Sequence, residues 1–221
     1  MDKPEIKITA DGSHTLYVPN LDETYHSVHG AIQEALHVFI KNGFNYSNKQ
    51  HLNILEIGFG TGLNTFLTLK EALKSKIKVN YSSIEAYPLS VETVNQLNYI
   101  EQLNMSSFEK ENFNKLHEIE WESYQAVNTN FNLRKLNIKL QDYEEMELYD
   151  LIYFDAFGPR VQPNLWEENI LKKMYNALKP NGVLVTYCAK GSVKRGLKSV
   201  GFKIESLPGP PGKREMTRAI K

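Results

Sequence analysis

A glycine-rich turn between a short apolar stretch and a helix-like stretch is the part of this chain best suited to hold a ligand. The turn reads Glu56-x-Gly58-x-Gly60-x-Gly62 and runs on to Asn64. Glycines let the backbone approach a ligand closely and adopt dihedral angles that other residues avoid. The helix N-terminus beyond the turn offers unpaired N–H groups and a partial positive charge. The combination predicts a seat for the polar part of a nucleotide-like ligand, although a glycine turn also occurs as a purely structural tight turn.

An acidic residue follows the glycine turn at a position where it can hold a ribose. The stretch from 79 to 85 is predicted to be a strand, and Glu85 ends it. A carboxylate at the end of such a strand can accept hydrogen bonds from both ribose hydroxyls of a bound ligand. The glycine spacing differs from the dinucleotide fingerprint G-x-G-x-x-G. The pattern therefore favours a ribose-containing ligand other than a nicotinamide dinucleotide.

Two aspartates follow later predicted strands. Asp142 comes just after the strand predicted over 134–140, where its carboxylate can meet an adenine amino group or can stand in an exposed turn. Asp155 ends the apolar strand predicted over 151–155, and the carboxyl ends of strands in an open α/β sheet border the ligand crevice. There it could hold an amine nucleophile by its N–H groups while the aromatic rings that follow exclude water. The alternative is a cap for the next helix.

No residue pattern indicates a metal site. His26, His29, His37 and His51 lack a convincing ligand spacing, and Cys188 is the only cysteine. A single cysteine allows no intrachain disulfide. Its apolar surroundings predict a small buried residue rather than a nucleophile. We therefore expect no metal.

Alternating strands and helices must position these residues. Apolar spacing and turn residues predict a hairpin over 5–18, strands over 53–57, 79–85, 134–140, 151–155, 183–187, 202–206 and 215–220, and helices over 28–41, 64–73, 89–100, 167–178 and 192–200. Residues 101–132 are acidic and helical in character, which predicts a helical insertion. We expect a single α/β domain over 1–221, in which residues 1–50 form an N-terminal hairpin and helix before a mostly parallel sheet. The last two strands have no helix between them and should pair antiparallel.

Charge is unevenly distributed in a chain whose net charge is zero. There are 11 acidic and 5 basic residues from 101 to 150, but 9 basic and 2 acidic residues from 187 to 221. A basic end on a neutral chain fits a polyanionic partner that touches one face; the alternative is solvated surface charge. No apolar run reaches the roughly 20 residues of a membrane helix, and the N-terminus lacks the apolar stretch of a signal peptide. We expect a cytoplasmic protein with no membrane partner.

Two sequence strings resemble one known family. They are Gly58-Phe59-Gly60-Thr61-Gly62-Leu63-Asn64 and Lys213-Arg214-Glu215-Met216. With the loop after Asp155, they resemble the methyltransferase part of the bifunctional bacterial enzyme that completes 5-methylaminomethyl-2-thiouridine at the wobble position of tRNA. The resemblance runs from about Tyr25 to the C-terminus. It implies a class I methyltransferase fold, with a mostly parallel seven-stranded sheet that ends in an antiparallel pair, and S-adenosylmethionine as the methyl donor.

The resemblance also implies roles for individual residues. At the methionine end of the cofactor it places Glu56, Gly58, Gly60, Thr61 and Asn64. It places Glu85 at the ribose, Asp142 at the adenine, and Asp155 with Phe157 and Pro159 at the aminomethyl group. Candidates for stacking on a flipped wobble base are Tyr25, Phe157 and Trp166. Candidates for binding tRNA phosphates are Lys190, Lys194, Arg195, Lys213, Arg214 and Arg218, some of which could instead be strand-edge charges.

The implied activity is N-methylation of 5-aminomethyl-(2-thio)uridine in the anticodon loop. These 221 residues contain no flavin-dependent oxidase half, so we expect a stand-alone methyltransferase and a separate enzyme that makes the aminomethyl intermediate. Gly158 and Arg160 depart from the residues usual in the family's loop. Two other functions fit the same pattern: methyl or aminopropyl transfer to a small amine, and cofactor binding without catalysis.

Overall fold

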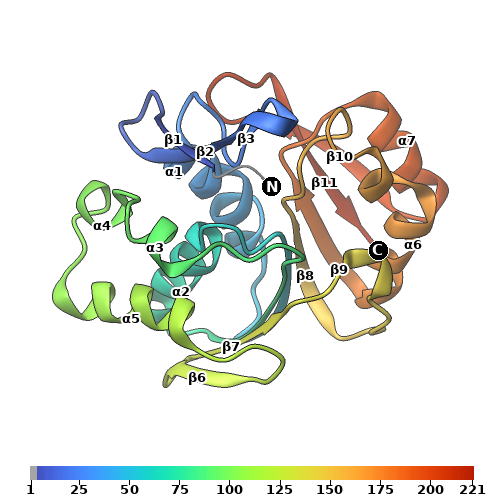
Figure 1. Cartoon of the computed structure of the whole chain (residues 1–221). Helices are drawn as coiled ribbons and strands as arrows, with labels where there is room; N and C mark the ends of the chain where they lie inside the picture. The colour runs from blue at the N-terminus through green and yellow to red at the C-terminus, as the bar shows by residue number, and fades with distance from the viewer. Residues whose placement is uncertain (1–3) are drawn as a thin grey trace.

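A mixed eight-stranded sheet crosses the molecule in the computed structural model, which describes residues 4–221. Its strands lie in the order β10-β11-β9-β8-β4-β5-β7-β6 (Figure 1). They are β4 (His51–Ile57), β5 (Lys78–Ile84), β6 (Gln125–Asn128), β7 (Phe131–Leu136), β8 (Tyr149–Phe154), β9 (Leu178–Thr186), β10 (Lys203–Pro208) and β11 (Glu215–Ile220). The five strands from β9 to β7 in that order are parallel, and β10 and β11 form an antiparallel pair. The predicted parallel sheet with a terminal antiparallel pair is therefore confirmed.

Helices cover both faces of this sheet. They are α1 (Ala31–Ala35), which continues as a π-helix over Leu36–Lys41, α2 (Leu63–Ser75), α3 (Val91–Val94), α4 (Tyr99–Gln102), α5 (Ser107–Glu118), α6 (Glu168–Ala177) and α7 (Gly191–Ser199). The helices α1, α2 and α5 share one apolar core with the sheet, and α6 and α7 share the other. None of the helices formed by residues 4–221 has the length and apolarity that crossing a membrane would require.

The central strand β8 shows how the two cores position the ligand crevice. All six of its residues are buried. Tyr153 packs into the core with α2, whereas Ile152 and Phe154 pack into the core with α6. Because side chains alternate along a strand, burial on both faces favours a continuous apolar run such as residues 151–154. Asp155 follows immediately, so the apolar strand delivers a carboxylate to the carboxyl edge of the sheet.

A second, small sheet lies at the N-terminus. It contains β1 (Glu5–Ile8), β2 (His14–Val18) and β3 (Glu23–Thr24), all antiparallel, and it lies beside α1 in Figure 1. The β1–β2 hairpin predicted from the sequence is confirmed. The turn of this hairpin contacts the start of α1, because Asp11 Oδ2 accepts a hydrogen bond from the backbone N–H of Gln33 at 3.0 Å.

Two predicted helices have different limits in the structure. The helix predicted over 28–41 begins only at Ala31, after Gly30, whose φ of +140° is unsuited to a helix. The helix predicted over 89–100 is divided into α3 and α4. Asn98 lies at the break, where its side chain donates to Gly12 O at 2.9 Å and accepts from His14 N at 2.7 Å. Tertiary contacts with the N-terminal sheet thus outweigh the local helical pattern.

The helical insertion predicted over 101–132 is wrong in its second half. Helix α5 ends at Glu118, and the chain then forms β6, which pairs antiparallel with β7. The sheet therefore has eight strands among the described residues 4–221, where seven were expected. The turn before β7 is stabilised by Asn128 Oδ1, which accepts from Asn130 N at 2.9 Å. Pairing with the edge of the sheet, which a local pattern does not reveal, decides this segment.

Candidate active site

A cavity of about 710 Å³ opens at the carboxyl ends of β4, β5, β7 and β8. Ligands of open α/β sheets bind at this edge. Three consecutive strand ends line one side of the cavity, through residues 57–64, 84–87 and 138–142. The other side is lined by the N-terminal segment, through residues 18–26, and by the loop after β8, through residues 155–165. The cavity thus lies between two segments that are far apart in the sequence.

The glycine turn after β4 forms the floor of this cavity. Gly58 and Gly60 have φ values of +93° and +49°, which side-chain-bearing residues rarely adopt. A Cβ at Gly58 would stand 3.1 Å from the carbonyl oxygen of Asp155, and one at Gly60 would stand 3.2 Å from the ring of Tyr25. Close approach on both sides therefore requires glycine here. Thr61 also lines the cavity, and helix α2 begins two residues later.

Asn64 and Asp155 come together beside the turn. Asn64 Nδ2 donates to Asp155 Oδ2 at 2.8 Å, which joins the first turn of α2 to the end of β8. Both side chains line the cavity. Burial, together with the negative charge of Glu34, raises the pKa of Asp155 well above its ordinary value. A carboxylate with a raised pKa is a better proton acceptor near neutral pH.

Glu85 and Asp142 line the same cavity from the ends of the next two strands. Glu85 Oε2 accepts from Gly60 N at 3.0 Å, and its Oε1 accepts from Tyr87 N at 2.9 Å. The carboxylate is therefore aimed at the glycine turn rather than at solvent. Asp142 ends a short 3-10 helix, Leu140–Asp142, and is exposed.

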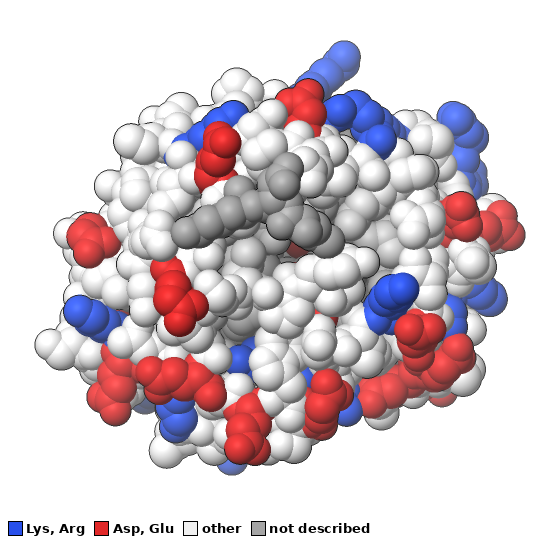
Figure 2. All heavy atoms as spheres, in the orientation of Figure 1, with Lys and Arg blue, Asp and Glu red and all other residues white. Residues whose placement is uncertain are grey.

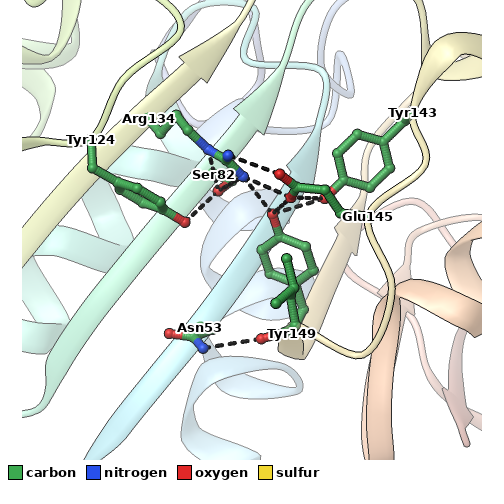
Figure 3. A network of polar contacts seen from close by, with 8 residues as sticks. Asn53, Ser82, Tyr124, Arg134, Tyr143, Glu145 and Tyr149 are labelled. Carbon is green, nitrogen blue, oxygen red and sulfur yellow. Dashed lines mark hydrogen bonds and ion pairs between the residues drawn. The ribbon is translucent and has the colours of Figure 1, made fainter.

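A network of polar side chains fixes the segment that carries Asp142 (Figure 3). Arg134 donates to both carboxylate oxygens of Glu145, at 2.9 and 2.7 Å. The hydroxyls of Tyr143 and Tyr149 donate to the same carboxylate, at 2.7 and 2.8 Å. Burial alone would raise the pKa of Glu145, but these hydrogen bonds, led by that of Arg134, lower it to about 2. The segment following β7 is thus tied to β8 by a charged group that stays ionised.

Glu56 lies beneath the cavity rather than on its surface. Its side chain is fully buried, and Glu56 does not line the cavity. Oε2 accepts from Thr65 Oγ1 at 2.8 Å and from Ser83 Oγ at 2.7 Å. Burial raises the pKa of Glu56 to about 7, against the lowering effect of these hydrogen bonds. Any influence of Glu56 on a ligand must therefore pass through the turn and helix above it.

Two of the three aromatic residues predicted for the substrate meet across the mouth of the cavity. The rings of Tyr25 and Phe157 are in edge-to-face contact, with centroids 5.3 Å apart, and both line the cavity. Trp166 is buried behind the loop, where its indole N–H donates to Phe157 O at 2.8 Å and its ring packs on Phe154. Pro159 belongs to the same loop, outside the cavity lining. Trp166 therefore supports the loop from behind, where stacking on a base is not possible.

The basic residues near the C-terminus divide into two groups. Lys194 pairs with Glu215 at 2.6 Å, Arg218 pairs with Glu205 at 2.8 Å, and Lys213 pairs with Glu34. Within residues 4–221, Lys190, Arg195 and Arg214 are exposed and form no ion pair. Figure 2 shows many acidic side chains along the lower edge of this face, whereas lysines and arginines stand together with acidic side chains at the upper and right edges.

Comparison with known proteins gives the enzyme class. Residues 95–221, more than half of the chain, match the sequence model of a family described as S-adenosyl-L-methionine-dependent methyltransferase. The chain belongs to this family. S-adenosylmethionine is therefore the cofactor of this methyltransferase, and the class I fold expected from the sequence is confirmed.

Relatives and solved structures agree with this class. The methyltransferase is 30% identical over 210 residues to the tRNA 5-methylaminomethyl-2-thiouridine biosynthesis bifunctional protein of Leptospira interrogans, covering 88% of this chain and 32% of the relative. It thus spans about a third of the length of the curated relatives that it matches. The crystal structure of MNMC2 from Aquifex aeolicus matches 99% of this chain and 70% of its own, with a TM-score of 0.79 and 26% identity. A spermidine synthase from Thermotoga maritima, with a TM-score of 0.56 and 16% identity, covers 100% of this chain and 69% of its own and shares the fold.

The residues of the cavity fit S-adenosylmethionine. A volume of about 710 Å³ lies within the range of roughly 300–1,000 Å³ that small-molecule sites occupy. The backbone of the glycine turn is accessible for a polar tail, and Glu85 and Asp142 supply acceptors at two further strand ends. Among residues 4–221, no group of three or more histidine, cysteine, aspartate and glutamate side chains is arranged to hold a metal ion.

Several lining residues were not predicted from the sequence. Asn20, Leu21, Tyr87, Gln162 and Asn164 all line the cavity. His26 lines it as well, and burial lowers the pKa of its imidazole to about 4, so the ring is neutral at neutral pH. Asn20 and Leu21 precede the first strand of the main sheet, and no local signal indicates that they lie at the carboxyl ends of its strands. Asn164 stands in the loop already singled out after Asp155 and could have been found there.

Proposed function

We propose that the methyltransferase methylates the amine of 5-aminomethyl-(2-thio)uridine at the wobble position of tRNA, which gives 5-methylaminomethyl-(2-thio)uridine. Relatives named for 5-methylaminomethyl-2-thiouridine biosynthesis in tRNA support the substrate. The observation that carries the proposal is the Asp155 carboxylate, which is held by Asn64 at 2.8 Å inside the cavity and beside the aromatic pair. A carboxylate in that position suits a substrate that presents N–H groups.

One side of the cavity is assigned to the cofactor. We call residues 57–64, 84–87 and 138–142 the cofactor side. On this side Gly58, Gly60, Thr61 and Asn64 hold the methionine end, Glu85 accepts hydrogen bonds from the ribose, and Asp142 accepts from the adenine amino group. Glu56 supports the turn from beneath. When bound, the cofactor supplies an electrophilic methyl group on a positively charged sulfur.

The opposite side of the cavity is assigned to the nucleoside. We call residues 18–26 and 155–165 the substrate side. A wobble base flipped out of the anticodon loop stacks against Tyr25 and Phe157, as single-stranded bases do on aromatic rings. The two rings, with Trp166 and Pro159 in the loop behind them, also exclude water from the reacting atoms.

Asp155 prepares the nucleophile. An alkylammonium has no lone pair, so the amine must lose a proton before its nitrogen attacks the methyl carbon. Asp155 accepts hydrogen bonds from the ammonium and takes this proton first. The neutral amine would then attack the methyl carbon, and the bond from that carbon to sulfur would break as the N–C bond forms. Burial and Glu34 make the carboxylate a stronger base. Alignment of the amine with the methyl group supplies a further part of the rate, because held reactants save roughly 7–11 kcal/mol at best.

The exposed cations contact the tRNA backbone. Lys190, Arg195 and Arg214 are solvent-accessible and can release counterions on binding phosphates. Lys194 and Lys213 can join them only while also held by Glu215 and Glu34. The aminomethyl group itself must come from an earlier enzyme, since the methyltransferase acts on a nucleoside that already carries it.

The test is nucleoside mass spectrometry of tRNA that carries 5-aminomethyl-2-thiouridine, after incubation with the protein and S-adenosylmethionine. We expect the nucleoside to gain one methyl group. In D155N the rate should fall by about 100-fold or more, the usual contribution of a proton-transfer group. E109Q, whose carboxylate pairs with Lys70 outside the cavity, should keep the full rate. No methyl gain by a protein that binds the cofactor would refute the proposal, and polyamines and other small amines would then be tested.

A further inference from the structure

An ion pair with one buried member lies near the substrate side of the cavity, and only the charge of its glutamate enters the mechanism above. Glu34 in α1 is 7% exposed, and its Oε1 is bound by the ammonium of Lys213. Its Oε2 accepts from the backbone N–H of Ser27 at 2.9 Å. The pair joins the end of the N-terminal segment to the loop between β10 and β11. These two parts of the chain are 179 positions apart at the ion pair.

The ion pair is connected to the Asp155 loop through an aromatic ring. Lys213 Nζ stands 3.9 Å from the centroid of the Tyr187 ring, within the range of a cation–π contact. The hydroxyl of Tyr187 donates to the backbone oxygen of Ala156 at 2.9 Å. Ala156 is the neighbour of Asp155. The contacts therefore run from Glu34 through Lys213 and Tyr187 to the residue next to the reactive carboxylate.

Charged and titratable groups surround Asp155 on every element packed around it. Glu34 from α1 and Glu56 from β4 raise its pKa, whereas the hydrogen bond from Asn64 and the charge of Lys213 lower it, and burial is the largest cause of its rise. Tyr187, which follows β9, stays protonated because burial and the charge of Asp155 raise its pKa well above its ordinary value. His26 is neutral, since burial lowers its pKa to about 4. The ion pair therefore contributes two opposite charges to this environment.

We propose that Glu34 and Lys213 are positioning residues of the reaction centre, which act through Asp155 with charges of opposite sign. This inference rests on the proposed role of Asp155 as acceptor of the amine proton. Glu34 keeps the Asp155 carboxylate basic enough to accept that proton. Lys213 opposes this effect with its positive charge. If the ion pair served only to stabilise the fold, replacing Glu34 and replacing Lys213 would not have opposite effects on Asp155.

The experiment compares cofactor binding with product binding across pH 5–9. S-adenosylmethionine and S-adenosylhomocysteine carry the same amino-acid and adenosine groups but differ in charge at sulfur. The ratio of their dissociation constants, measured by calorimetry, therefore reports the charge of a carboxylate near the sulfur. In the wild type this ratio should favour the methyl donor increasingly as Asp155 ionises, and D155N should abolish the dependence. This binding measurement does not require the enzyme to transfer a methyl group.

Replacing the two members of the ion pair should shift the midpoint of this pH dependence in opposite directions. The midpoint is the pH at which half of the change in the ratio of dissociation constants has occurred. E34Q removes a negative charge and should shift the midpoint to lower pH, and K213M removes a positive charge and should shift it to higher pH. Each shift should be about one pH unit, the size expected from one nearby charge at an effective dielectric constant of about 20. K213R keeps the charge and should leave the midpoint in place. K70M and E109Q break an ion pair of 2.8 Å between α2 and α5, outside the cavity, and should also leave it in place.

The outcomes separate this inference from the proposed function. Shifts in the same direction, or no shift, would overturn the inference even if tRNA were methylated normally. A pH dependence that survives in D155N would also overturn it, because the midpoint would belong to another group. Opposite shifts in a protein that leaves tRNA unmodified would uphold the electrostatic role and reject the tRNA substrate. If E34Q fails to fold, K213M and K213R still test the inference, because only K213M should shift the midpoint to higher pH.

Discussion

The cofactor side and the substrate side of the cavity are built from the chain in different ways. Each part of the cofactor side follows directly on a strand: residues 57–64 on β4, 84–87 on β5, and 138–142 on β7. The substrate side combines residues 18–26, which precede the main sheet, with the loop after β8, and the Glu34–Lys213 pair behind it joins α1 to the C-terminal loop. One side is local in sequence, and the other depends on long-range contacts.

This difference has a physical origin. A parallel sheet brings the carboxyl ends of its strands to one edge, so residues that follow strands gather there whatever the rest of the chain does. On the substrate side the loop after β8 obeys this rule, but residues 18–26 do not. Tyr25 reaches the cavity because the N-terminal sheet is docked on α1, and its ring then rests on Gly60 and meets Phe157. Changes on the two sides should therefore separate cofactor affinity from nucleoside recognition.

The largest effect on the cofactor side is expected from G58A. Alanine would have to adopt a φ of +93° and place its Cβ 3.1 Å from the carbonyl oxygen of Asp155. A left-handed conformation costs about 1–2 kcal/mol, and the contact adds to it. We expect the dissociation constant of S-adenosylmethionine to rise about tenfold or more, since 1.4 kcal/mol corresponds to a factor of ten. Calorimetry would measure the loss of cofactor affinity, and thermal unfolding would measure the loss of stability.

A matched glycine provides the control for this change. Gly158 stands in the loop after Asp155, has no positive φ, and a Cβ there would lie at an ordinary 3.6 Å from the Tyr187 hydroxyl. G158A should leave cofactor affinity within about twofold, a difference of roughly 0.4 kcal/mol. Equal losses in G58A and G158A would show that the turn has no special need for glycine.

How far the sequence predicts this molecule follows from the same comparison. Gly58, Glu85 and Asp155 could be assigned to the cavity because each follows or ends a predicted strand. The edge strand β6 could not be predicted, since its pairing with β7 is a tertiary event in a segment of helical character. Trp166 was expected at the substrate and is buried beneath the loop, because nothing in the sequence tells which face of the loop an aromatic residue takes.

Glu56 allows a test of what lies under the cofactor side. Burial raises the pKa of Glu56 from 4.5 to about 7 in the folded protein, so the fold favours the protonated carboxyl. Its contribution to stability is fully present below pH 4.5 and is lost as the pH rises through about 7. Glutamine cannot ionise and avoids this loss. The free energy of unfolding of E56Q relative to the wild type should therefore rise by up to about 3 kcal/mol between pH 4.5 and 8.

Denaturant unfolding at pH 5 and pH 8 measures this difference, with E109Q as the control. Hydrogen bonding with Lys70 and Ser106 lowers the pKa of Glu109 to about 2, so this group does not titrate in that range. E109Q should run parallel to the wild type. A constant difference between E56Q and the wild type at both pH values would mean that Glu56 is ionised in the folded protein, with its second oxygen hydrogen-bonded to water.

The smallest effects are expected from two exposed cations outside the cavity. Arg195 and Arg214 are exposed cations outside the cavity, so replacing either with glutamine should leave cofactor affinity unchanged. If each contacts one tRNA phosphate, each change should reduce the slope of log affinity against log salt by about one. Binding titrations at several salt concentrations would measure the slope. K110Q removes an exposed cation from α5, on the acidic part of the surface, and should leave the slope intact. Equal effects of all three changes would indicate a general response to net charge. A reduced slope confined to R195Q and R214Q would locate the RNA near these two residues.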